Sequence, residues 1–263
     1  MNYNGIITKM KAQNNEFVSY KLPIGDNMVS MNTLIGKNIK LKFLDIIECT
    51  KCGQKIKKSF RQGFCYPCFI NAPEASECIF RPELCRAHEG ESRDMEWSKK
   101  YCLSKQYIYM SFTGNLKIGV TRSTQIPTRW IDQGATKAIL LCEAPNRYIA
   151  GLIEMYLKKF FSDRTNWRKM LSGKFEEPDF NKNYLDAKQY LDAKFSEYIT
   201  DSQWVDINYP IESIPEKIKS FSFEKEQTYE GILTGIKGQY LIFKENTVLN
   251  IRKHTGYHIS LDY

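Results

Sequence analysis

Two C-x-x-C pairs lie close together in the chain, Cys49 with Cys52 and Cys65 with Cys68. This spacing lets a tight turn direct two thiolates at one ion, and two such turns complete the tetrahedron of a structural zinc site. Gly53, directly after the first pair, suits the left-handed backbone that such a turn often needs. We therefore predict that these four cysteines bind one zinc ion.

The alternative for either pair is a redox dithiol. A thioredoxin-like motif is single and lies at the start of a helix in a β-α-β unit, a context that this sequence lacks. The start of the chain has no signal-peptide pattern, and no apolar run approaches the roughly 18 residues of a membrane span. We expect a cytoplasmic protein that does not bind membranes. In that reducing compartment, clustered cysteines bind metal more often than they form disulfides.

A second group of candidate ligands follows: Cys78, Cys85, His88 and Cys102. The C-x-x-H spacing of Cys85 and His88 can place two ligands on one ion, and the four ligand types suit a second zinc ion. Two alternatives remain open, namely ordinary buried thiols beside a hydrogen-bonded histidine, or a catalytic Cys85–His88 pair. The sequence does not decide whether the four residues share one ion. The eighth cysteine, Cys142, lies in an apolar run and is predicted to be a core residue.

Both ends of the chain alternate apolar and polar residues, a pattern typical of strands. The segment that begins at Gly5 resembles the segment that begins at Gly231, and later glycines, Gly36 and Gly256, follow in the same order. Coincidence between two short β-rich segments is the alternative to a duplication. If the resemblance is real, the two ends form one β-barrel or sandwich, because a lone three-stranded unit cannot bury its apolar face.

Strand and helix patterns alternate between these β-rich ends. A short loop with Gly114 joins two strand-like runs, Pro127 can open a helix, and Gly134 can end it. The elements predicted here are strands at 107–112, 116–121 and 138–142 and helices at 127–133, 147–161 and 182–200.

The order of these elements resembles the GIY-YIG nuclease domain, which has a hairpin with two short motifs, a helix with an arginine, a third strand and a helix with a glutamate. Tyr107-Ile108-Tyr109 lies where the first motif belongs, and Lys117-Ile118-Gly119 lies where the second belongs. Arg129 and Glu154 match the arginine and the glutamate. The sequence departs from the family where Tyr107 replaces a glycine and Lys117 a tyrosine. Gln133 lies near the position of a histidine that many members use.

The resemblance implies metal-dependent cleavage of a phosphodiester bond. Glu154 would hold one Mg²⁺, and Arg129 would bind the scissile phosphate. Tyr109 would orient or deprotonate the attacking water, its pKa lowered by Lys117 and the metal. Structural roles are the alternatives: a half-buried strand tyrosine, a solvated lysine, and an ordinary ion pair of Arg129 with Glu154.

Over nearly its full length the sequence also resembles an uncharacterised bacterial family known only as a domain of unknown function. The resemblance lies in four sequence segments: Gly63–Cys68, Arg81–Cys85, Pro127–Ala135 and Gly235–Tyr240. It implies a domain composition and no particular reaction.

The formal net charge is +8, which favours an anionic partner such as nucleic acid. Basic residues gather in two places, and aromatic residues among them suit phosphate contact with base stacking. A solvated face is the alternative for each place. The candidate nucleic-acid contacts are Lys55, Lys57, Lys58, Arg61, Lys158, Lys159, Arg164, Trp167 and Arg168.

We therefore expect an α+β protein with a split β domain, an inserted zinc-binding module and a GIY-YIG-like α/β module. The predicted parts are the first β segment 1–48, the zinc module 49–104, the α/β module 105–175, a helical connector 176–204 and the second β segment 205–263. The expected function is nucleic-acid binding, to DNA or RNA, with Mg²⁺-dependent endonuclease cleavage as its specific mechanism. The alternatives are an inactive zinc-dependent nucleic-acid-binding or adaptor protein with a protein partner, and an RNA-processing factor.

Overall fold

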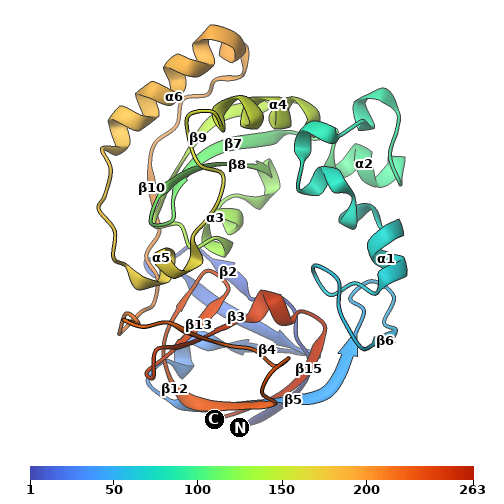
Figure 1. The fold of residues 1–263 in the computed structure, drawn as a ribbon, viewed down its shortest axis with the longest axis vertical. Coiled ribbons are helices and arrows are strands. Elements are labelled where there is room, and N and C mark those ends of the chain that lie inside the picture. The colour runs from blue at the N-terminus through green and yellow to red at the C-terminus, as the bar shows by residue number, and fades with distance from the viewer. The chain divides into compact units, whose positions relative to one another are not determined.

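The computed structural model describes residues 1–263, apart from the side chain of Ala193. The chain has several sheets and few helices, and the predicted mixed α+β class is confirmed. It divides into two compact units, of which unit 1 contains Met1–Ile70 and Asn208–Tyr263 and unit 2 contains Asn71–Ile207 (Figure 1). None of the described helices is both long enough and apolar enough to cross a membrane.

Unit 1 consists mainly of strands, and its largest sheet has the order β1-β15-β5-β12-β13-β14-β11, with β6 paired to β5. The strands of this sheet are β1 (Asn2–Ile6), β5 (Asn38–Glu48), β6 (Lys55–Ile56), β11 (Lys219–Phe221), β12 (Thr228–Lys237), β13 (Tyr240–Phe243), β14 (Thr247–Asn250) and β15 (Tyr257–Asp262). A second sheet contains β2 (Lys11–Gln13), β3 (Ser19–Ile24) and β4 (Asn27–Ser30). The short helices are η1 (Met31–Leu34), η8 (Ile251–His254) and α1 (Tyr66–Asn71), which crosses the unit boundary.

Strands from the two ends of the chain are neighbours in the large sheet. β1 pairs antiparallel with β15, β12 with β5, and β15 with β5. Alternate side chains of these strands are fully buried, among them Ile39, Leu41, Ile259 and Leu261. Leu41 and Leu261, which lie five residues after Gly36 and Gly256 respectively, are paired directly across β5 and β15. The apolar faces of both terminal segments are thus buried in unit 1.

The two halves of unit 1 repeat the same order of elements and the same backbone contacts. A hairpin, a 3₁₀ helix and a long strand follow one another in β3-β4-η1-β5 and again in β13-β14-η8-β15. The Gly36 N–H donates to the Leu233 carbonyl at 2.8 Å, and the Gly256 N–H donates to the Ile7 carbonyl at 2.9 Å. Both glycines have the positive φ that favours glycine, 84° and 95°.

Unit 2 has one antiparallel sheet with the strand order β10-β9-β7-β8. Its strands are β7 (Gln106–Phe112), β8 (Leu116–Arg122), β9 (Lys137–Ala144) and β10 (Val205–Asp206). Its α-helices are α2 (Met95–Tyr101), α3 (Thr128–Asp132), α4 (Arg147–Leu157), α5 (Trp167–Ser172) and α6 (Phe180–Phe195). Its 3₁₀ helices are η2 (Pro73–Ala75), η3 (Glu77–Ile79), η4 (Pro82–Leu84), η5 (Ala87–Glu89), η6 (Ser123–Gln125) and η7 (Ser196–Tyr198).

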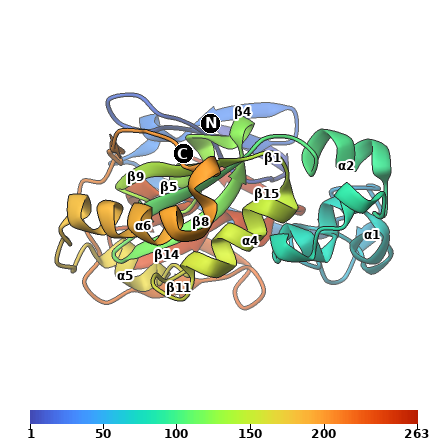
Figure 2. The ribbon, with the colours of Figure 1, turned by 90° about the horizontal axis from the view of Figure 1, so that it is seen from above.

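The two faces of the unit 2 sheet have different roles. Ile108, Met110 and Ile118 are fully buried and share a core with residues of α4 and α6, which lie close to each other over the sheet (Figure 2). Because side chains alternate along a strand, Tyr109 and Lys117 point to the other face. That face therefore carries Tyr109 and Lys117, two of the residues predicted to be catalytic.

Strands β7, β8 and β9 and helices α3, α4 and α6 form where the sequence patterns predict them, although α6 ends at Phe195 rather than at residue 200. Helices α2 and α5 and strand β10 are not among the predicted elements. Helix α4 ends at Leu157, not Phe161, because the N–H groups of Phe160 and Phe161 both donate to the Leu157 carbonyl in a closing turn. The boundary between the units follows Ile70, so the two cysteine groups of the predicted zinc module belong to different units.

Candidate functional site

The four cysteines of the C-x-x-C pairs lie together in unit 1. All four sulfur atoms are within 4.8 Å of one another, and the sulfurs of Cys52 and Cys65 are 3.8 Å apart. Two thiolates on one tetrahedral zinc ion lie about 3.8 Å apart, given Zn–S bonds of about 2.3 Å. The first turn is closed by the Gly53 N–H, which donates to the Cys49 carbonyl at 2.8 Å, with φ of 72° at the glycine. This group could hold one zinc ion.

Backbone donors favour the ionised form of a zinc ligand in this group. Burial opposes ionisation of Cys49, but backbone N–H groups of Cys65, Cys52 and Lys51 outweigh it and lower the pKa of Cys49 to about 6. The Cys65 N–H, for example, donates to the Cys49 sulfur at 3.1 Å. A thiolate, and not a thiol, is the form that binds zinc.

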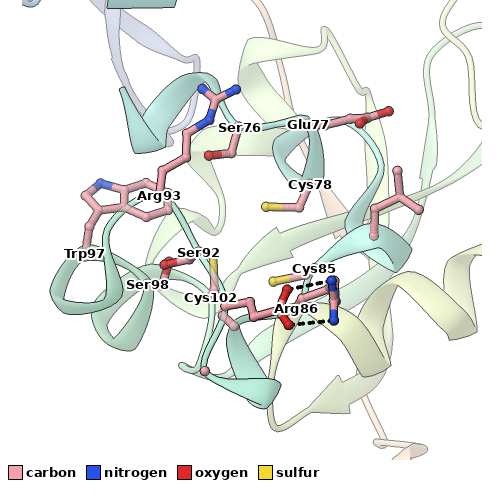
Figure 3. Close-up of a pocket in the computed structure, with 14 residues that line it drawn as sticks. Ser76, Glu77, Cys78, Cys85, Arg86, Ser92, Arg93, Trp97, Ser98 and Cys102 are labelled. Carbon is pink, nitrogen blue, oxygen red and sulfur yellow. Dashed lines mark hydrogen bonds and ion pairs between the residues drawn. The ribbon is translucent and has the colours of Figure 1, made fainter. Parts of the chain in front are cut away.

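The second group, in unit 2, contains three cysteines. The sulfurs of Cys78, Cys85 and Cys102 lie within 4.8 Å of one another, so this group too could hold a zinc ion (Figure 3). The structure does not place His88, the predicted fourth ligand, in this group. The His88 ring instead stacks on Tyr148, with centroids 4.3 Å apart and planes 16° apart.

Contacts within the second group favour the ionised form of at least one sulfur. Hydrogen bonds from the thiols of Cys78 and Cys85 lower the pKa of Cys102 to about 2, with a further contribution from the positive charge of Arg147. The same contacts raise the pKa of Cys78. The Arg147 Nε donates to the Cys102 sulfur at 3.3 Å from the first turn of α4.

The four predicted catalytic residues lie on four elements of unit 2: Tyr109 on β7, Lys117 on β8, Arg129 on α3 and Glu154 on α4. The charges of Arg129 and Glu154 both act on the pKa of Tyr109 and on the pKa of Lys117. The structure therefore brings these residues, which are far apart in the sequence, into one electrostatic neighbourhood.

Tyr109 is fully enclosed beside a glycine that leaves room for it. The register pairs Tyr109 with Gly119, and a Cβ atom on Gly119 would lie 2.5 Å from the Tyr109 hydroxyl oxygen. The hydroxyl donates to Gln133 Oε1 at 2.9 Å. Burial raises the pKa of Tyr109 and outweighs the opposing charge of Arg129. Without a metal ion, the enclosed phenol therefore stays un-ionised because it has lost its solvation.

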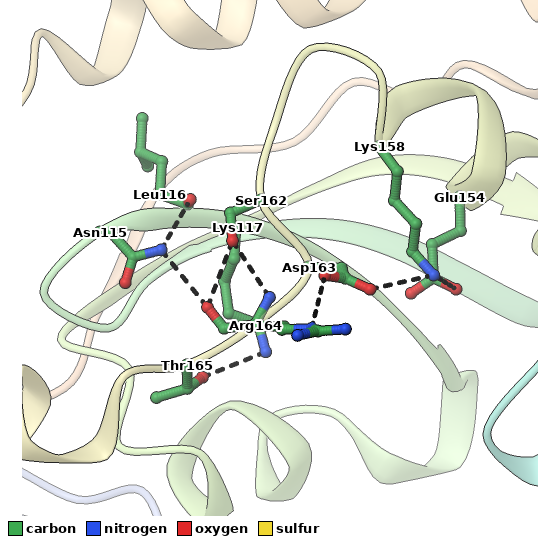
Figure 4. A network of polar contacts seen from close by, with 9 residues as sticks. All are labelled: Asn115, Leu116, Lys117, Glu154, Lys158, Ser162, Asp163, Arg164 and Thr165. Carbon is green, nitrogen blue, oxygen red and sulfur yellow. Dashed lines mark hydrogen bonds and ion pairs between the residues drawn. The ribbon is translucent and has the colours of Figure 1, made fainter.

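Lys117 is buried with 4% of its surface exposed, so it is not a solvated strand residue. Its ammonium group donates to Thr165 Oγ1 at 3.2 Å (Figure 4). Burial lowers the pKa of Lys117 to about 8, and the charge of Arg129 acts in the same direction. Burial therefore moves the pKa of Lys117 toward neutral pH and the pKa of Tyr109 away from it.

Glu154 belongs to a small ionic network. Lys158 Nζ lies 3.3 Å from Glu154 Oε2 and 3.3 Å from Asp163 Oδ2 (Figure 4). Burial raises the pKa of Glu154 despite the nearby Lys158. The sequence reasoning missed Asp163 and Thr165, because their segment becomes a neighbour of β8 only through tertiary pairing, in which the Ile118 N–H donates to the Ser162 carbonyl at 2.8 Å.

The two predicted basic clusters lie in different units. In unit 1, Arg61 lies over the Phe69 ring at 5.4 Å, and Phe69 stacks with Phe60. The lysines of that cluster, Lys55, Lys57 and Lys58, are exposed. In unit 2, the Arg168 guanidinium lies 4.3 Å from the centre of the Trp167 ring. The remaining members there are exposed Lys159, exposed Arg164 and half-buried Lys158.

These features define an α+β protein with two cysteine groups that could hold zinc ions and with a partly buried polar site in unit 2. A family whose description is "Protein of unknown function (DUF2797)" matches residues 36–259. Because this match covers most of the chain, the protein belongs to that family, in agreement with the predicted resemblance to a family of unknown function. No match is found among curated proteins or among solved structures.

Proposed function

We propose that the protein is a zinc-containing nucleic-acid-binding protein and that unit 2 cleaves phosphodiester bonds with the help of a divalent metal ion. The observation that supports this proposal is the neighbourhood of Tyr109, Lys117, Arg129 and Glu154 on four different elements. Burial of charged groups is unfavourable for folding, and groups with displaced pKa values concentrate at functional sites.

Glu154 would bind the metal ion. Its carboxylate and that of Asp163 lie on either side of Lys158, each 3.3 Å from the same ammonium group. Two carboxylates that share one cation are suited to Mg²⁺, a hard cation that prefers oxygen ligands. Lys158 would move away from Glu154 when the metal binds.

Arg129 and Lys117 would act on the substrate. The planar guanidinium of Arg129 can bind a phosphate through two parallel hydrogen bonds. Lys117 would accept the proton of the attacking water, because a base works best when its pKa lies near the working pH and its own pKa is about 8. Tyr109, an un-ionised phenol bonded to Gln133, would orient the water rather than deprotonate it.

One observation favours the second candidate, a nucleic-acid-binding protein without catalysis. Glu154 already has a charged partner in Lys158, and Tyr109 is fully buried, so the site as folded satisfies much of its own polarity. In that case the exposed basic residues with neighbouring aromatic rings, such as Arg168 with Trp167, would provide the affinity.

Cleavage assays separate the two candidates. The zinc-loaded protein would be incubated with single- and double-stranded DNA and RNA in Mg²⁺, in Mn²⁺ and in EDTA. We expect metal-dependent cleavage that Glu154→Gln reduces by at least about 100-fold, since the metal contributes several kcal/mol to the transition state. The matched control is Glu143→Gln, which removes the same charge from an ion pair with Lys105 that is substantially exposed. Salt-sensitive binding without cleavage would refute the phosphodiesterase and support the second candidate.

We also propose that both ends of the chain form one duplicated β domain. The repeated order of elements and the matching bonds of Gly36 and Gly256 support it. Deletion of residues 228–263 should then abolish hydrogen-exchange protection in residues 1–45, because β1 and β5 would lose β15 and β12. Unchanged protection of residues 1–45 would refute this proposal.

A further inference from the structure

The second cysteine group differs from the first in the number of protein ligands. Four cysteine sulfurs gather in unit 1, whereas only the sulfurs of Cys78, Cys85 and Cys102 gather in unit 2 among the side chains that the structure describes. Structural zinc sites are closed by four protein ligands, whereas zinc sites with three protein ligands leave one position for a ligand from outside.

A cavity of about 600 Å³ opens onto the three sulfurs. All three cysteines line it, together with the hydroxyls of Ser92 and Ser98 (Figure 3). One water molecule occupies about 30 Å³ in the liquid, so the cavity admits a small molecule as well as water. A fourth ligand can therefore reach an ion at this group from solvent.

His88 is not among the described residues that line this cavity. Its ring stacks on Tyr148, and the ring of Tyr148 itself packs against the cysteine group. The imidazole is thus engaged in this stacking contact and does not line the cavity. The packing therefore favours a ligand from the cavity over His88.

The net charge of the zinc–thiolate complex and of Arg147 favours one kind of fourth ligand. Three thiolates and one Zn²⁺ ion have a net charge of −1, and the buried guanidinium of Arg147, 3.3 Å from the Cys102 sulfur, compensates it. Arg147 is fixed there by a second hydrogen bond, from Nη2 to the Tyr101 carbonyl at 3.1 Å. A neutral fourth ligand preserves this balance.

We propose that Cys78, Cys85 and Cys102 bind a zinc ion whose fourth ligand is a small neutral oxygen or nitrogen donor that enters from the cavity. Water fills this role by default, and a substrate heteroatom or an added imidazole can replace it. The proposal rests on the zinc part of the proposed function and is independent of phosphodiester cleavage.

Cobalt substitution tests the proposal, with imidazole as the probe. Co²⁺ replaces zinc in the full-length protein, and the visible d–d bands report the ligands of each ion. We expect two ions per chain, and a saturable change of the bands with imidazole that is the same in wild type and in His88→Ala. Ser92→Trp, at an exposed position of the cavity lining, should weaken the response without loss of metal. Cys102→Ser should remove the response.

Three results would overturn the proposal, and they are distinguishable. One ion per chain in wild type would refute a metal at the second group altogether. Two ions with no response to imidazole would show a closed site and leave the zinc assignment intact. A changed spectrum or a lost ion in His88→Ala, before imidazole is added, would show that His88 is the fourth ligand. A control variant, Cys142→Ala, removes a buried thiol outside both groups and should change nothing in the spectrum.

Discussion

Replacement of Lys117 by methionine should stabilise unit 2 at neutral pH and abolish the cleavage that we propose. Methionine has a similar length and no charge, so it can occupy the same buried space. The folded protein has to bury the ammonium group of Lys117, of which 4% is exposed, with one hydrogen bond to Thr165 at 3.2 Å. A buried charge that lowers the stability of the fold is typical of a functional residue.

The lowered pKa of Lys117 gives the size of the expected change in folding free energy. A pKa lowered from 10.5 to about 8 corresponds to about 3 kcal/mol, at about 1.4 kcal/mol per unit. Loss of the bond to Thr165 offsets about 1 kcal/mol, so Lys117→Met should gain about 2 kcal/mol at pH 7. Between pH 8 and 10.5 the unfolded chain binds more protons than the folded one, so the stability of wild type rises with pH. The gain from Lys117→Met should shrink over that range.

Tryptophan fluorescence during urea unfolding provides the assay. The four tryptophans of the chain all lie in unit 2: Trp97, Trp130, Trp167 and Trp204. A matched control lies in unit 1, where Lys237 is 6% exposed and burial lowers its pKa to about 8 as well. Lys237→Met should change neither the tryptophan transition nor cleavage. If Lys117→Met leaves the stability of unit 2 unchanged or lowers it at pH 7, or if the gain does not depend on pH, the account of Lys117 is wrong.

Three other predictions concern different parts of the protein. The cleavage rate should rise with pH up to about 8, where Lys117 becomes neutral, and then level off; a rate that falls over this range would mean that Lys117 acts as a cation. Gly151→Ala should lower stability by about 1–3 kcal/mol in thermal unfolding, although alanine favours helices, because its Cβ would lie 2.1 Å from the Glu83 backbone nitrogen; a gain in stability would contradict this packing. Cys52→Ser should cost one zinc ion per chain by elemental analysis and weaken the fold around the first group, whereas an unchanged zinc content would refute that site.

Local patterns in the sequence were sufficient to predict the hairpin of unit 2. The loop residue Gly114 has φ of 87°, and Gly134, after α3, has φ of 72°, so both occupy backbone conformations that glycine favours. The C-x-x-C spacing likewise predicted which cysteines come together, because each tight turn directs two thiolates at the same ion. These features depend on neighbours along the chain.

The features that the sequence could not give depend on packing between distant segments. The spacing of Cys85 and His88 suits one ion, but stacking on Tyr148 of α4 places the histidine ring elsewhere. The pKa of Tyr109 depends on burial by several elements, and a list of charged neighbours does not reveal it. Asp163 reaches Lys158 only because the loop after α4 returns along β8.

Binding of Mn²⁺ by the zinc-loaded protein, followed by electron paramagnetic resonance, tests the proposed metal centre most directly. Wild type should bind one Mn²⁺ ion, and Glu154→Gln should lose that binding. Lys158→Met should bind more tightly than wild type, because the ammonium group 3.3 Å from the Glu154 carboxylate no longer competes with the metal. Equal binding in all three proteins, or none in wild type with nucleic acid present, would contradict the proposal that Glu154 holds a catalytic metal ion.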